Sequence, residues 1–301
     1  MNVWVIAESA ALVAELVTGA KQLGATEITA FAGCEKSATV GASKLVVMPL
    51  LPNVMWEAYA PVIAEKAKAE APAVILVGAT KRGKEIAAQL AALLDAPCIS
   101  DCKSIAIDGA KKTTTRMIYG GMAVKTQSTE APILIATIGA KTYEAQPESA
   151  ACPIETLAAP ASAVVVTARE PKVSSGVNLS EAAIIVAVGR GFVEKSELKI
   201  AEDLAKAAGG EMACSRPIAE FFKWMPEEAY VGISGQIVKP QLYIACGISG
   251  QAQHISGMRD SKIVVAINKD ENAPINAQSD YYIVGDVKAV LPEITKAVAA
   301  R

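Results

Sequence analysis

Short runs of Val, Ile and Ala alternate with longer amphipathic stretches along most of the chain, and this alternation strongly constrains the fold. The first run, Val3–Ala7, is followed by Ser9, which can cap a helix extending to about Leu23. Buried parallel strands read as short apolar runs because helices cover both faces of their sheet. The alternation therefore predicts βαβ units and an α/β fold built on parallel sheets.

The first half of the sequence predicts a parallel sheet with an antiparallel extension. Further strands are expected at 27–31, 44–48 and 73–77, with helices at 54–69 and 83–94 between them. After Ser100, strand-like runs are joined by Asp108-Gly109 and Gly120-Gly121, which are typical of hairpins. These runs lie at 104–107, 113–119 and 133–138.

A polar segment with one Pro and one Gly lies between Arg169 and Glu181, and we place a domain boundary there. The prediction is an N-terminal α/β domain at 1–172, a linker at 173–182, and a Rossmann-like parallel α/β domain at 183–301. In the second domain the expected strands are 183–188, 211–214, 242–246, 262–267 and 281–284. Helices are expected at 195–208, at 251–258 and from the last strand to Ala300.

Composition excludes several function classes. Lys and Arg number 29 against 31 Asp and Glu, so no basic surplus exists to bind nucleic acid. A single histidine, His254, excludes a His-rich metal site. The six cysteines form no CxxC pair and are expected to be reduced thiols of a cytoplasmic protein. No apolar run is long enough to cross a bilayer and the N-terminus does not resemble a signal peptide, so no membrane insertion is expected.

The first candidate binding motif is Gly189-Arg190-Gly191, where a predicted strand ends. Glycines let a backbone approach a ligand, and Arg190 can bind phosphate. The third glycine of a dinucleotide fingerprint is replaced by Glu194, although Glu211 has the spacing of a ribose-binding acid. By itself the motif fits either nucleotide binding or a glycine-containing turn.

The next motifs are also ambiguous when each is taken alone. Arg216 follows another strand and is either a ligand contact or a solvated arginine, and Ser234 lies in a Gly-x-Ser-Gly sequence that fits a binding loop or a turn. In the sequence from Gly247 to His254, Ser249 can cap a helix. A Ser-His-Asp triad is implausible because the only histidine follows five residues later on the same element.

Asn268 and Asp286 follow the last two predicted strands, so polar groups end five strands of one domain. The carboxyl ends of parallel strands meet at one edge of a sheet, where open α/β sheets bind ligands. We therefore expect a ligand crevice at this edge.

With these residues in view, the second half closely resembles the FAD-binding domain of electron-transfer flavoprotein alpha subunits. The resemblance is carried by Leu242 to His254, by Ile267-Asn-Lys-Asp270 and by Asp280 to Asp286, with matching spacing. The first half is similar to the family more loosely, mainly in Lys81-Arg82-Gly83 and Tyr119-Gly120-Gly121. Where the family often has Val-Gly-Gln-Thr-Gly, this chain has Val231-Gly-Ile-Ser-Gly235, which keeps a hydroxyl.

The resemblance implies that the chain binds FAD and carries electrons from flavin dehydrogenases of the acyl-CoA dehydrogenase type to a quinone reductase or other acceptor. The implied partner is a beta subunit in a heterodimer. Arg190 and Ser215 would contact the diphosphate or nucleotide half, Arg216 would lie over the flavin near N5, and Ser234 would bond N5. The implied FAD-binding residues are Arg190, Ser215, Arg216, Val231, Gly232, Ile233, Ser234, Ser249, Gly250, Gln251, Ala252, Gln253, His254, Asn268, Asp286 and Val287.

In that set, Ser249 to His254 would line the ribityl chain and the pyrimidine edge, with His254 near the C2 carbonyl, and Asn268, Asp286 and Val287 would hold the adenosine end. Arg216 and His254 would supply a cation or donor where reduction places negative charge. No substrate-converting residues are expected. Two alternatives are a nicotinamide-dependent dehydrogenase built on Gly189-Arg-Gly191 and a non-redox adenine-nucleotide-binding module.

Overall fold

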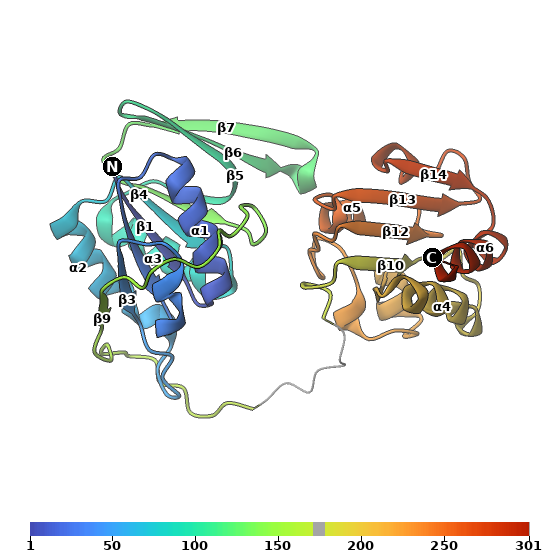
Figure 1. Cartoon of the computed structure of the whole chain (residues 1–301), viewed down its shortest axis with the longest axis horizontal. Helices are drawn as coiled ribbons and strands as arrows, with labels where there is room; N and C mark the ends of the chain where they lie inside the picture. The colour runs from blue at the N-terminus through green and yellow to red at the C-terminus, as the bar shows by residue number, and fades with distance from the viewer. Residues whose placement is uncertain (171–177, 301) are drawn as a thin grey trace. The chain divides into compact units, whose positions relative to one another are not determined.

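The computed structural model describes residues 1–170 and 178–300, which form two compact units (Figure 1). The first unit comprises Met1–Tyr119 and Ala123–Pro171, and the second comprises Gly120–Met122 and Lys172–Arg301. Residues 173–177 of the predicted linker lie outside the described residues.

Within its described residues the first unit contains one sheet, with strand order β7-β6-β5-β8-β4-β1-β2-β3-β9. All neighbours pair in parallel except β5 with β6 and β6 with β7, which confirms the expected parallel sheet with an antiparallel extension. The strands are β1 (Asn2–Ala7), β2 (Glu27–Ala32), β3 (Lys44–Val47), β4 (Val74–Gly78), β5 (Cys98–Asp108), β6 (Lys111–Ile118), β7 (Ala123–Thr129), β8 (Leu134–Ile138) and β9 (Ile154–Thr156).

Helices cover both faces of this sheet, so alternate residues of β1 enter different cores. Val3 and Val5 pack with the helix α1 on one face, and Trp4 and Ile6 pack with α2 and α3 on the other. Ser9 caps α1 as expected, because its Oγ accepts a hydrogen bond from the Leu12 amide. The helices are α1 (Ala10–Gln22), α2 (Ala60–Glu70) and α3 (Lys81–Leu94).

Two local expectations for the first unit need correction. The helix expected at 54–69 is a 3₁₀ turn, η2 (Trp56–Tyr59), followed by α2, which has Pro61 in its first turn. Strands β7 and β9 were not expected, since their largely exposed residues lack an apolar run.

The second unit contains, among its described residues, one parallel sheet with strand order β11-β10-β12-β13-β14. This confirms the Rossmann-like parallel prediction. From β10 the chain connects to β11 on one side, and from β11 it returns to β12 on the other side of β10. The chain therefore leaves β10 and β12 in opposite directions, which makes the point between these two strands the topological switch point. The strands are β10 (Ile184–Val188), β11 (Glu211–Cys214), β12 (Leu242–Cys246), β13 (Ile263–Asn268) and β14 (Tyr281–Val284).

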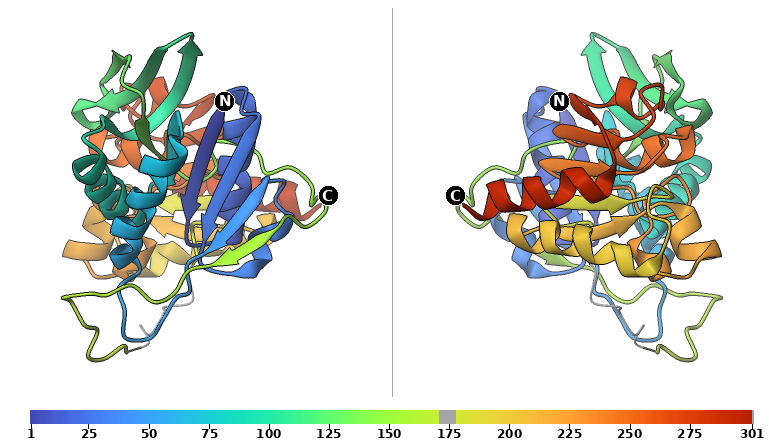
Figure 2. Two further views of the ribbon diagram at one scale, coloured as in Figure 1. Left: turned by 90° about the vertical axis from the view of Figure 1, so that its left-hand side faces the viewer. Right: turned by 90° about the vertical axis from the view of Figure 1, so that its right-hand side faces the viewer.

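Two helices, α4 (Leu198–Ala208) and α6 (Val287–Ala299), lie side by side on one face of this sheet (Figure 2, right). The short helix α5 (Ala252–Met258) packs on the opposite face through Ile255 and Met258. Pro292 lies inside helix α6.

No helix among the described residues is both long and apolar enough to span a bilayer. All six cysteines are free, four of them are buried, and Cys34 and Cys98 are partly exposed.

Candidate functional site

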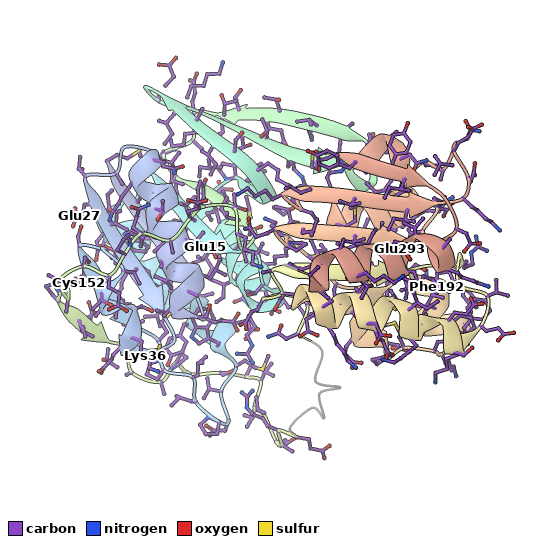
Figure 3. The ribbon with its side chains drawn as sticks, turned by 45° about the vertical axis from the view of Figure 1, so that its right-hand side comes forward. Glu15, Glu27, Lys36, Cys152, Phe192 and Glu293 are labelled. Atoms are coloured by element: carbon purple, nitrogen blue, oxygen red, sulfur yellow. The ribbon has the colours of Figure 1, made fainter. Side chains whose placement is uncertain are left out.

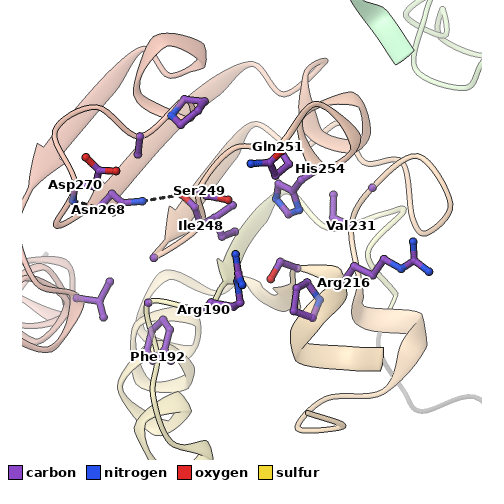
Figure 4. Close-up of a pocket in the computed structure, with 18 of the residues that line it drawn as sticks. Arg190, Phe192, Arg216, Val231, Ile248, Ser249, Gln251, His254, Asn268 and Asp270 are labelled. Atoms are coloured by element: carbon purple, nitrogen blue, oxygen red, sulfur yellow. Dashed lines mark hydrogen bonds between the residues drawn. The ribbon is translucent and has the colours of Figure 1, made fainter. Parts of the chain in front are cut away.

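A crevice of about 860 Å³ lies at the carboxyl ends of the second unit's strands (Figure 4). Each of the five strands contributes residues at its carboxyl end: Asn268 is the last residue of β13, and the others follow their strands, with Arg190 after β10, Ser215 after β11, Gly247 after β12 and Gly285 after β14. The volume lies in the range of small-molecule and cofactor sites. The polar strand ends singled out in the sequence therefore meet at one edge of the sheet.

Most of the predicted site residues line this crevice. Gly250 and Ala252 do not: the Gly250 backbone packs against Ile275, and Ala252 begins α5. Those that line it are Arg190, Ser215, Arg216, Val231, Gly232, Ile233, Ser234, Ser249, Gln251, Gln253, His254, Asn268, Asp286 and Val287.

The glycines after β10 allow two loops to touch. A Cβ on Gly191 would lie 2.5 Å from the Gly247 Cα, and a Cβ on Gly189 would lie 2.5 Å from the Gly247 carbonyl oxygen. The Gly191 amide donates to the same carbonyl at 2.9 Å. The sequence predicts that these glycines allow close approach of a ligand, whereas in the structure they first allow the two loops to touch at the switch point.

Arg190 lies on the loop after β10, lines the crevice and has no ion-pair partner among the described residues. Ser215 is buried at the end of β11, with its amide donating to the Val188 carbonyl at 2.9 Å. An unpaired guanidinium in a crevice attracts an anion, and phosphate oxygens suit its planar set of donors. Arg190 is thus a cation of the crevice that is free for a ligand; Lys269 also lines the crevice and has no ion-pair partner among the described residues.

Arg216 lines the crevice but is already paired. Its Nε donates to Glu220 Oε2 at 2.6 Å, and this hydrogen bond raises the Arg216 pKa. Both residues belong to the turn around η5 (Pro217–Phe221), and the guanidinium extends away from Arg190 (Figure 4). The bond to Glu220 occupies only Nε, so a ligand in the crevice would share the Arg216 guanidinium with this carboxylate.

Ser234 is hydrogen-bonded to the hydroxyl of Tyr230, which is almost fully buried and also lines the crevice. The phenol ring of Tyr230 lies beside Gly235, where a Cβ would come within 2.6 Å of it. Ser234 is a predicted site residue and Tyr230 is not, because a tyrosine at the end of a loop carries no binding signal by itself.

His254 is buried in the first turn of α5, with 7% of its surface exposed. Its Nε2 lies 2.9 Å from the Tyr243 hydroxyl, and its Nδ1 has no hydrogen bond of normal geometry among the described residues. Burial lowers the pKa of His254 to about 4, although a hydrogen bond between the ring and the Val231 backbone opposes the shift. At neutral pH the ring is a donor or acceptor and carries no positive charge in this state.

Several other expectations change with the structure. Ser249 does not cap α5, because the N-cap position is Gln251. Asn268 donates from Nδ2 to the Ile248 carbonyl at 2.9 Å and accepts from the Asp270 amide, so its side chain joins two loops. Asp286 caps α6 through the Lys288 amide. Glu211 begins β11, at the edge opposite the crevice, which overturns its interpretation as a ribose-binding acid.

Apolar crevice residues were largely missed by the sequence argument. Phe192, labelled in Figure 3, is buried in the core on the α4 side. Phe222 is 47% exposed and stacks on Trp224 with ring centroids 4.8 Å apart. Neither residue belongs to a recognisable motif. The only signal for Phe192 is that it directly follows Gly189-Arg190-Gly191 in the sequence. The missed apolar lining residues also include Ile248, Ala273 and Pro274, whereas the charged Lys269 and Asp270 belong to the Ile267-Asn-Lys-Asp270 motif.

Comparison with known proteins gives matches to two family models. Residues 3–162 match the model described as electron transfer flavoprotein domain, and residues 178–259 match electron transfer flavoprotein FAD-binding domain. Among curated proteins, the chain is 40% identical over 308 aligned residues to Protein FixB of Escherichia coli O6:K15:H31, of Escherichia coli O157:H7 and of Shigella flexneri. Each alignment covers 99% of this chain and 98% of the relative.

Proposed function

The chain belongs to the alpha-subunit family of the electron-transfer flavoproteins, and on that premise we propose that the crevice of its second unit binds FAD. Proteins of this kind carry electrons, use a flavin cofactor and work with a beta subunit and redox partners. A nicotinamide-dependent dehydrogenase is not favoured.

The observation that carries the proposal is the unpaired Arg190 at the switch point of the second sheet. A diphosphate-bearing flavin brings the anion that this guanidinium lacks, and FAD differs from FMN by the diphosphate and adenosine. The polar side chains of Ser234, Gln251 and His254 also line the crevice, which supports a ligand with a hydrogen-bonding ring edge. The crevice therefore fits a ligand with an anionic part and a polar planar part.

Each residue of this chain then has a defined task. Arg190 holds the diphosphate, Ser215 and Ser249 offer hydroxyls along the cofactor, and Asp286 and Val287 contact the adenosine end. Ser234 and His254 orient the flavin ring through hydrogen bonds. When bound, the flavin itself supplies the electron-accepting chemistry.

We further propose that the chain works as a heterodimer with the beta subunit, takes electrons from a flavin dehydrogenase of the acyl-CoA dehydrogenase type, and passes them to a quinone reductase or another acceptor. Within the described residues, no group of three or more His, Cys, Asp or Glu side chains could hold a metal ion. Electron transfer between bound flavins needs no nucleophile or general base, which agrees with the implausible geometry of a Ser249–His254 triad.

The test is reconstitution of the chain, with its beta subunit, with FAD or with FMN, read from the visible absorption of bound flavin. We expect FAD to bind more tightly than FMN and the variant Arg190→Ala to weaken FAD binding at least about tenfold. The control is Lys262→Ala, an exposed lysine just before β13 at the opposite edge of the sheet. Equal affinity for FMN and FAD, or an unchanged affinity in Arg190→Ala, would refute the proposal.

A further inference from the structure

Two consecutive phenylalanines follow the strand β11, and the second of them lines the crevice. Phe222 is 47% exposed and lines it, whereas Phe221 is 75% exposed and does not. The other two phenylalanines of the chain, Phe31 and Phe192, are buried in cores. An aromatic ring that stays half exposed beside a ligand crevice is available for contact with that ligand.

The loop that carries Phe222 has a defined shape. The Phe222 amide donates to the Pro217 carbonyl at 3.0 Å, and the Trp224 amide donates to the Ile218 carbonyl at 3.0 Å. Lys223, between the two rings, has φ of 51°. A residue other than glycine keeps this left-handed conformation only where its surroundings impose it. The hydrogen bonds on either side of Lys223 therefore fix where the two rings lie.

Trp224 supports one face of the Phe222 ring. The ring centroids lie 4.8 Å apart and the ring planes are 21° from parallel, which is a stacked arrangement. Trp224 is itself partly buried and packs against the core that contains Ile218. Phe222 is thus backed by a residue that is anchored in the core, while it also lines the crevice.

The place of Phe222 along the sheet selects the part of a ligand that it meets. Strands β11 and β14 are the two edges of the second sheet, and four strand spacings, or about 19 Å, separate them. Phe222 follows β11, and the segment from Val231 to Ser234 lies at the same end, because the Val231 amide donates to the Cys214 carbonyl. Asp286 follows β14. A ligand that extends along the crevice therefore meets Phe222 and Asp286 with opposite ends.

We propose that Phe222 contacts the flavin ring of the ligand and that Trp224 is a positioning residue, which holds Phe222 for this contact. The inference rests on the proposed function, in which Ser234 orients the flavin ring and Asp286 contacts the adenosine end. The flavin ring is planar and aromatic, and aromatic rings in offset-stacked or edge-to-face contact stabilise each other beyond the area that they bury. Phe222 thereby contributes affinity for the flavin half of the cofactor and none for the adenosine half.

Titration with two ligands tests this assignment. The chain in complex with its beta subunit is titrated with FAD, read from visible absorption, and with ADP, which has the adenosine and diphosphate without the flavin, read by calorimetry. Phe222→Ala should weaken FAD binding about tenfold, which equals about 1.4 kcal/mol, and leave ADP binding unchanged. Phe222→Tyr keeps the ring and should bind FAD like the unaltered chain. Equal weakening of FAD and ADP in Phe222→Ala overturns the assignment to the flavin ring.

Phe221→Ala is the matched control, because Phe221 is the more exposed neighbour and does not line the crevice. It should leave FAD affinity unchanged. At saturating FAD, the visible circular dichroism of the bound flavin should change in Phe222→Ala and stay the same in Phe221→Ala, since only the first loses a ring next to the flavin. Equal loss of FAD affinity in both variants contradicts the inference. Loss of affinity for the beta subunit alone in Phe222→Ala would make the ring a subunit contact and also overturn it.

A double-mutant cycle tests the part of Trp224. Trp224→Leu keeps apolar bulk against the core and removes the stack, so it should weaken FAD binding about threefold in the unaltered chain. In the Phe222→Ala background it should cause no further loss, because the ring that it positions is already gone. The same loss in both backgrounds contradicts the positioning role.

The FAD titration also separates this inference from the proposed function. An unaltered complex that binds no FAD refutes the proposed function and the flavin contact together. A complex that binds FAD, with the same affinity in Phe222→Ala, overturns this inference while the proposed function stands.

Discussion

At the scale of single residues, Arg216 lines the crevice while its guanidinium is bonded to Glu220 on the same turn. A ligand that uses Arg216 has to share its guanidinium with this carboxylate. We expect Glu220→Gln to bind FAD about threefold more tightly, because exposed ion pairs are weak and the competition is modest. Measurement of flavin affinity by titration checks this.

The control for this change is Asp203→Asn, which breaks another exposed ion pair with four-residue spacing, Lys199 with Asp203, on α4. It should leave flavin affinity unchanged. Arg216→Ala should bind FAD more weakly than the unaltered chain and lower the flavin's first reduction potential, since a cation near the ring favours its reduced form. If both Glu220→Gln and Arg216→Ala bind FAD like the unaltered chain, Arg216 is not a ligand contact.

The lowered pKa of His254 predicts a pH dependence of stability. The unfolded chain takes up a proton on this residue near the ordinary pKa of 6.5, whereas the folded chain does so only near 4. Between these values the unfolded state binds more protons, so stability falls as pH drops from 6.5 to 4. The loss over the window is about 3 kcal/mol.

Chemical denaturation at several pH values measures this dependence. The variant His254→Gln removes the group, and subtraction of its profile cancels the contribution of the carboxylates. The difference between the two profiles should be flat above pH 6.5 and fall below it. Parallel profiles between pH 4 and 6.5 would show that the folded chain protonates His254 normally.

At the scale of elements, the crevice depends on the contact between the loops that follow β10 and β12. Gly191→Ala places a Cβ 2.5 Å from the Gly247 backbone, which cannot move aside as a flexible side chain would. We expect this variant to lose most FAD binding and about 1–3 kcal/mol of stability, as overpacked sites do. Thermal unfolding and flavin titration measure the two effects.

Gly209→Ala is the matched control for this substitution. Gly209 ends α4 with φ of 65° and has open space around its Cβ position. Alanine there should destabilise the chain by about 1–2 kcal/mol through backbone strain and keep FAD binding intact. Equal loss of FAD binding in both variants would indicate general destabilisation in place of a local effect on the crevice.

At the scale of the whole molecule, the crevice has an exposed apolar margin. Phe222 and Ile233 line it and are 47% and 53% exposed. Cofactor sites usually bury most of their ligand's surface, so we expect the chain alone to hold FAD poorly and the beta subunit to complete the site. Gel filtration of the chain with and without the beta subunit, with absorption recorded across the peak, tests this. A monomeric chain that keeps one FAD per polypeptide would contradict it.

The sequence by itself determined the alternation of strands and helices in the two units and the position of the crevice. Buried strands leave apolar runs, and polar residues at Arg190, Ser215 and Asn268 come directly after such runs. Parallel strands bring their carboxyl ends to one edge whatever else the chain does. This rule places the residues that end the five strands at one edge of the sheet without knowledge of any contact between them.

Only the tertiary structure decided what each of these residues touches. Gly191 meets Gly247 across the switch point, and Tyr243 meets His254 between a strand and a helix. Arg216 and Glu220 are close in sequence, yet their pairing depends on an irregular turn whose shape no periodicity predicts. Hydrogen bonds and close contacts depend on the positions of atoms from different elements, whereas sequence spacing reports only the period of the element to which each residue belongs.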